Sequence, residues 1–158
     1  MVISKHRLLV FLFSVGLIAC IPSTVSTPIS STTVPSMLLR ATRTGGLCPY
    51  GACYTELIIN MDGSFSLRQG EQVTESGVFE TPQVTELVGL IEATDFQLLR
   101  THEFTGLCPT AYDGSELAYT FYTSKGLESL DTCQIEIDST LPPFSTISQI
   151  IDELLSHE

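Results

Sequence analysis

Two alternating stretches around Asp62-Gly63 constrain the fold of this chain more than any other feature. From residue 54 to 61 apolar and polar side chains alternate, and the same period of two resumes after the turn with Phe65 and Leu67. Successive residues of a β-strand point to opposite faces, and Asp-Gly is a preferred two-residue hairpin turn. The pattern therefore predicts an antiparallel hairpin with one apolar face and one face in water.

Weaker patterns predict the other strands. We expect one at residues 37–43, a weak one at 73–80 and one at 117–121, with one or two more within 127–138. Gly-containing turns of hairpin length separate several of them. Short connections of this kind favour an antiparallel sheet.

Two segments carry apolar residues at helical spacing. Thr81-Pro82 predicts a helix start, with Thr81 as the N-cap and Pro82 in the first helical position. The apolar stripes are Val84, Leu87, Val88 and Ile91 in the first segment, and Ile147, Ile150, Ile151 and Leu154 in the second. The order strands, helix, strands, helix predicts an α+β fold, with five to six antiparallel strands and both helices packed on one face of the sheet.

The first 19 residues resemble a bacterial lipoprotein signal peptide. Lys5 and Arg7 precede an apolar run that ends in Leu17-Ile18-Ala19-Cys20. A spanning helix needs about 20 apolar residues, more than this run has. The resemblance implies cleavage after residue 19, a diacylglyceryl and palmitate anchor on Cys20, and a protein held on a membrane of the bacterial envelope, facing the periplasm or the exterior. A plain secretory signal and a retained anchor are the alternatives.

Residues 20–36 are mostly Ser, Thr and Pro and carry no charge. Such a segment cannot bury enough apolar surface to offset its ordering entropy, so we expect an extended tether. Residues 37–158 are then one folded domain, since about 120 residues suffice for a single core.

The charge of the chain bears on its partners. It has 18 Asp and Glu against 7 Lys and Arg, and cleavage before Cys20 would leave five basic residues and a formal charge of −13. Such a surface repels phosphate backbones, so no nucleic-acid partner is expected. Membrane attachment is expected through the lipid, with an envelope protein as the candidate partner.

Four cysteines remain besides Cys20. An even number in an exported chain predicts disulfides with three alternative pairings, of which we favour Cys48–Cys53 and Cys108–Cys133. A redox pair is typically Cys-x-x-Cys at a helix start, and a zinc site typically has closely paired ligands. Neither pattern is present, so the sequence predicts no metal and no cofactor.

Part of the chain resembles a family of small bacterial envelope domains of unknown function. The resemblance rests on Arg43-Thr44-Gly45-Gly46-Leu47-Cys48-Pro49 before a strand, on Asp62-Gly63 in the following hairpin and on a helix that ends in Asp95-Phe96. It covers residues 37–153 and implies a fold and a compartment. The family carries no activity and no catalytic residues over to this chain.

The sequence contains no nucleophile-elbow, zinc-protease or phosphate-loop motif, so no catalytic residue is predicted. Glu136 and Asp138 could form a carboxylate pair, but alternation with Ile135 and Ile137 favours a solvated strand face. His102 is expected to be an isolated loop residue.

The two Cys-Pro loops are the candidate binding surface. They contain Tyr50, Tyr112 and Asp113, and loops held by a rigid scaffold often carry function. The sequence thus favours a lipid-anchored, non-enzymatic binding or assembly module of the envelope. The alternatives are an enzyme inhibitor that presents a disulfide-held loop and an enzyme with an unrecognised site.

Overall fold

The computed structural model describes residues 36–46 and 53–156, all within the second of two compact units of the chain. The predicted signal peptide, Cys20 and the tether up to residue 35 lie outside the described residues. So do Cys48 and Tyr50.

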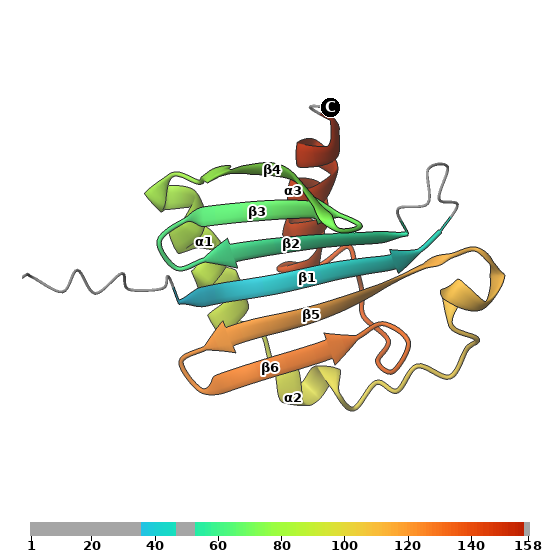
Figure 1. Cartoon of the computed structure of the whole chain (residues 1–158). Coiled ribbons are helices and arrows are strands. Elements are labelled where there is room, and N and C mark those ends of the chain that lie inside the picture. Colours follow the sequence, from blue (N-terminus) through green and yellow to red (C-terminus); the bar gives the residue numbers. More distant parts are fainter. Residues whose placement is uncertain (1–35, 47–52, 157–158) are drawn as a thin grey trace, which may run out of the picture. The chain divides into compact units, whose positions relative to one another are not determined.

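Six antiparallel strands form one sheet, in the order β4-β3-β2-β1-β5-β6 (Figure 1). Their bounds are β1 (Met37–Gly45), β2 (Tyr54–Asn60), β3 (Ser64–Gln69), β4 (Gln72–Val78), β5 (Ser115–Thr123) and β6 (Gly126–Asp131). The hairpin predicted around Asp62-Gly63 is β2–β3, with Leu57 opposite Leu67. The first strand pairs with both β2 and β5 and so lies in the interior of the sheet.

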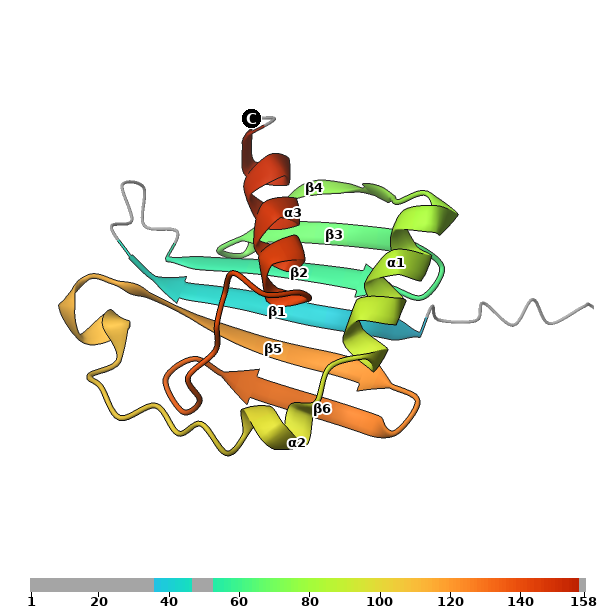
Figure 2. The same cartoon turned by 180° about the vertical axis from the view of Figure 1, so that it is seen from behind.

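The helical segments are α1 (Thr81–Glu92), α2 (Phe96–Leu99), η1 (Pro109–Tyr112) and α3 (Phe144–Ser156). Figures 1 and 2 show α1 and α3 on the same side of the sheet, with their axes across the strands. The α+β class and the one-sided placement of the two long helices are therefore confirmed. The short segments α2 and η1, in the connection from α1 to β5, were not predicted.

The start of α1 differs from the prediction by one residue. Glu80 rather than Thr81 is the N-cap, and Pro82 follows one position further into the helix. The Gln83 side-chain oxygen accepts a hydrogen bond from the Glu80 N–H at 3.0 Å, which satisfies a donor just outside the first turn.

Of the one or two strands expected within residues 127–138, one is present as β6, and the alternation that continues after it does not form a second. Within residues 132–138 only Ile135 forms a bridge, to Glu103, and no strand is present there. The Asp131 carboxylate accepts from the Cys133 N–H at 2.7 Å, and the Asp131 carbonyl accepts from Gln134 and Ile135. These contacts turn the chain and end the strand.

The core lies between the sheet and the helices, on what we call the covered face of the sheet. Its buried side chains include Leu39, Ala41, Leu57, Ile59, Tyr119 and Phe121 from the sheet and Leu87, Ile91, Phe144, Ile147 and Ile151 from the helices. Rings join the two layers: Phe96 lies 5.3 Å from Phe121, and Phe144 lies 5.1 Å from Tyr119, centroid to centroid. No helix in the described ranges is long and apolar enough to cross a membrane.

Candidate functional site

The opposite face of the sheet, which we call the open face, carries none of the described helices (Figure 1). The strand register places on it the residues that alternate with the core: Arg40, Thr42, Glu56, Ile58, Ser66, Arg68, Ala118 and Thr120. Most of them are polar or charged, which fits a face in water. Glu56 is the exception, because it is charged but not exposed to water.

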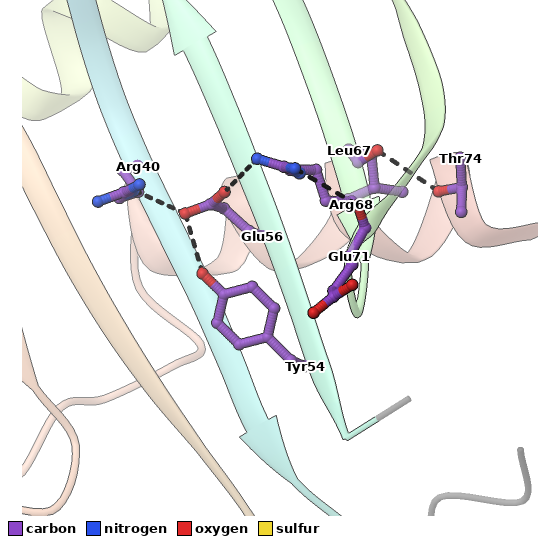
Figure 3. Close-up of polar contacts among 7 residues, drawn as sticks. All are labelled: Arg40, Tyr54, Glu56, Leu67, Arg68, Glu71 and Thr74. Atoms are coloured by element: carbon purple, nitrogen blue, oxygen red, sulfur yellow. Dashed lines mark hydrogen bonds and ion pairs between the residues drawn. The ribbon is translucent and has the colours of Figure 1, made fainter. Parts of the chain in front are cut away.

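Glu56 is almost completely buried although none of the described helices covers it. Its relative exposure is 3%, and it is the one charged residue among the described residues that is classed with the buried core. Among the described residues, its charged and hydrogen-bonding neighbours are side chains from the same face. Figure 3 shows the Arg40 and Arg68 guanidinium groups on two sides of the carboxylate, and Tyr54 on a third. We call these four residues the Glu56 cluster.

The strands position each member of the cluster. Tyr54 precedes Glu56 by two residues on β2 and so shares its face. Arg68 lies directly opposite Glu56 in the β2–β3 register, while Arg40 reaches it diagonally from β1. Three strands thus contribute to a single polar centre.

The contacts within the cluster are unequal. Glu56 Oε1 forms an ion pair with Arg40 Nε at 2.7 Å and accepts a hydrogen bond from the Tyr54 hydroxyl at 2.9 Å. The Arg68 Nη1 atom stays 4.0 Å from Glu56 Oε2, which is ion-pair distance but not a hydrogen bond. Arg68 Nη2 donates to the Glu71 carbonyl at 3.4 Å, and its buried Nε has no hydrogen-bond partner.

Tyr54 responds electrostatically to this environment. Burial raises the pKa of its hydroxyl, and the hydrogen bond to Glu56 and the charge of that carboxylate raise it further. The tyrosine therefore stays protonated and remains a donor to Glu56 throughout the neutral range.

A disulfide lies at one end of the open face. Cys108 and Cys133 are bonded, with 5.1 Å between their Cα atoms, as the sequence predicted. The Glu116 carboxylate contacts both sulfur atoms, at 2.8 and 2.9 Å, and also accepts from the Thr44 hydroxyl at 2.9 Å. Cys53 is also disulfide-bonded, and its expected partner Cys48 lies outside the described residues.

Cys108, Glu116 and Cys133 bring three potential metal-ligand atoms within 4.8 Å of one another. A metal would need the deprotonated thiolates, which the disulfide consumes. In its bonded form this cluster does not fit a metal ion.

The structure brings the bases of the two Cys-Pro loops together. The Gly46 N–H, just before the first loop, donates to the Gly114 carbonyl at the end of the second loop at 2.9 Å. Tyr112 and Asp113 are exposed at the end of η1, where Asp113 adopts a left-handed conformation with φ 62°. Asp113 therefore has a backbone role as the C-cap of η1. No side-chain contact within the described residues indicates which partner it would bind.

His102, Glu136 and Asp138 are all exposed, as expected for solvated carboxylates and a loop histidine, but Glu136 and Asp138 lie outside any strand and His102 is not isolated from them. They line a cavity of about 600 Å³ with apolar walls from Leu98, Leu99, Ile137 and Leu141. The Glu136 N–H donates to the His102 carbonyl at 2.8 Å and ties the two segments together. Hydrogen bonds from Thr140 lower the pKa of Asp138, so its carboxylate is held ionised.

No family model, no curated protein and no solved structure matched this chain. The resemblance to small envelope domains and to lipoprotein signal peptides therefore stays a prediction. Sequence reasoning missed the Glu56 cluster as a site, although the hairpin register that builds it was visible in the alternating pattern.

Proposed function

We propose that this protein is a lipid-anchored, non-enzymatic binding module of the bacterial envelope, and that it contacts its partner through the open face of the sheet. The anchor is proposed on Cys20, with the tether giving the domain reach from the membrane. The sequence pattern at residues 17–20 supports the anchor.

The Glu56 cluster is the observation that carries the binding role. A carboxylate is costly to bury and needs hydrogen bonds and opposite charge. The open face of the sheet does not need a buried carboxylate for stability, since an exposed polar side chain at position 56 would serve the fold as well. The fold nevertheless holds Glu56 between two half-exposed arginines, in close contact with Arg40 and at ion-pair distance from Arg68, so that both guanidinium groups are drawn to one place on the open face.

Lipid attachment is tested at the N-terminus. Mass spectrometry of the mature protein is expected to show an acylated Cys20 as the first residue, and Cys20→Ala is expected to abolish the modification and leave an uncleaved precursor or a released protein. An unmodified mature N-terminus at another residue would refute the anchor.

The binding face is tested by photo-crosslinking in the cells that produce the protein. A photoreactive benzoylphenylalanine in place of Tyr122, which is an exposed open-face residue of β5, is expected to form a specific adduct. The matched control places the same amino acid at Gln97, which is exposed on α2. Equal adducts at the two positions, or adducts only at Gln97, would contradict the proposed face.

A second candidate function, an enzyme with an unrecognised site, is favoured by the cavity at His102. Ligand pockets commonly enclose about 300–1,000 Å³ with apolar walls and a few convergent polar groups, as this cavity does. A panel of chromogenic esters and glycosides tests it. Turnover that Glu136→Gln abolishes without changing the thermal unfolding midpoint would establish this second function.

A further inference from the structure

We infer that Arg40 and Arg68 together receive a carboxylate group of an acidic protein partner on the open face. This inference rests on the proposed binding function and names the chemistry of its partner. It follows from the hydrogen-bond donors that the Glu56 cluster leaves unused and from the charge around it.

Arg40 has more donors than Glu56 uses. Its Nε makes the 2.7 Å contact with Glu56, and no other partner of its guanidinium is found among the described residues. The side chain is 49% exposed, so the two Nη groups remain accessible. A guanidinium held through Nε presents a fixed edge of N–H donors, which suits a carboxylate.

Arg68 is even less occupied. It makes one long hydrogen bond to the Glu71 carbonyl, lies beyond hydrogen-bond distance from Glu56, and is 43% exposed. Figure 3 shows the Glu71 carboxylate turned away from this guanidinium. Arg68 is therefore not required as a hydrogen-bond donor to Glu56. Arg40 and Arg68 lie on two sides of the Glu56 carboxylate, so both guanidinium groups could contact one incoming group there.

The cluster carries an excess of positive charge in an acidic chain. Two of the other basic residues have acidic partners: Arg43 pairs with Asp152 and Arg100 with Glu128. Lys125 lies near enough to Glu92 to add to the effect of Ser124 in lowering its pKa. Within the described ranges, only the Glu56 cluster sets two cations against one carboxylate.

The net charge of the Glu56 cluster indicates which kind of ligand it would bind. One net positive charge can pair with one carboxylate of a flexible acidic segment whose other charges stay in water, whereas a membrane of anionic lipids would bring a dense layer of charge against the acidic remainder of the domain. At about 0.15 M salt the Debye length is near 8 Å, so distant repulsion is screened while direct contacts persist. An acidic side chain on a protein partner is the occupant that meets these conditions.

The test uses the full-length lipidated protein in detergent and two peptides labelled with a neutral dye. A hexaglutamate peptide is expected to give a saturable rise in fluorescence anisotropy, and a hexaglutamine peptide is not. Arg40→Lys keeps the charge but loses the planar fork, and it is expected to weaken binding about tenfold, the equivalent of about 1.4 kcal/mol. Arg100→Gln, the matched control outside the cluster, is expected to bind as the unmodified protein does.

Folding is controlled with the double variant Arg40→Gln/Glu56→Gln, which removes a cation and an anion together. It is expected to retain the fold by circular dichroism and to lose hexaglutamate binding. Equal binding of the two peptides, or loss of binding in Arg100→Gln to the same extent, would overturn the inference.

Two further measurements distinguish a carboxylate from other anions, and distinguish failure of this inference from failure of the proposed binding function. Binding of inorganic phosphate or of anionic vesicles to the protein, without binding of hexaglutamate, would reject a carboxylate partner. Failure of hexaglutamate to bind while the Tyr122-specific photo-adduct persists would remove the carboxylate inference and leave the binding function standing. Loss of both signals would reject both.

Discussion

The two faces of the sheet bury side chains by different means. On β2, the neighbours Leu57 and Glu56 are 0% and 3% exposed, yet they point to opposite faces. Leu57 belongs to the core beneath the helices, whereas the Glu56 carboxylate is surrounded by Arg40, Arg68 and Tyr54 of its own face (Figure 3). Burial under helices serves the stability of the fold, because apolar area is removed from water. Burial beneath two arginines adds little net stability and instead fixes charged groups in place.

The largest effect is expected from truncation on the covered face. Phe121→Ala removes a fully buried ring that packs against Phe96 and Tyr119, and it should cost about 3–5 kcal/mol of unfolding free energy. Its neighbour Thr120 points to the open face, and Thr120→Ala should change stability by about 0.5 kcal/mol or less. Urea unfolding of both variants measures the contrast, and similar losses would show that the two faces are not distinct.

The disulfide at the end of the open face comes next. Replacing Cys108 and Cys133 with Ser opens a loop with a sequence separation of 25, which should cost about 3 kcal/mol. The loss should appear in thermal unfolding, while the photo-adduct at Tyr122 should persist below the lowered midpoint. Loss of the adduct in a folded double-serine variant would move the binding surface to the disulfide end.

A smaller loss is expected from uncovering Glu56. Arg40→Gln leaves a buried carboxylate with a weaker partner and should destabilise the domain by about 1–3 kcal/mol. Adding Glu56→Gln removes the buried charge and should recover most of that loss. A double variant as unstable as the single one would mean that Arg40 acts through packing rather than through charge.

The smallest effect concerns Tyr54 and depends on pH. Because the folded-state pKa of Tyr54 is raised above 10.0, the unfolded chain deprotonates first, and its stabilising contribution is lost as pH rises above that value. Tyr54→Phe should therefore be less stable than the unmodified protein at neutral pH by about 1 kcal/mol, the worth of one hydrogen bond. The gap should narrow above pH 10.0, and a gap independent of pH would contradict the contact with Glu56.

The covered face could be predicted well from the sequence, because its residues follow from the spacing of apolar side chains along each strand and helix. Alternation around Asp62-Gly63 gave the β2–β3 hairpin, and helical spacing gave α1 and α3. The pattern failed after β6, where the Asp131 side chain turns the chain although apolar residues continue to alternate. Local hydrogen bonds there override the hydrophobic period.

The candidate site was harder to predict because it depends on neighbouring strands. The hairpin register alone places Arg68 opposite Glu56, but Arg40 joins only through the pairing of β1 with β2. His102 and Glu136 likewise meet through a contact between loops that no local pattern encodes. Pairings across the sheet and between loops carry the functional chemistry, and single-strand patterns do not reveal them.

One measurement tests the separation of the two faces most directly. The double variant Arg40→Gln/Glu56→Gln is placed in a chain that carries the photoreactive residue at position 122, and thermal unfolding and adduct formation are followed together. The account predicts an unfolding midpoint close to that of the unmodified protein and loss of the adduct, since the open face would keep its fold but lose its paired cations. A folded double variant that still forms the full adduct would contradict it.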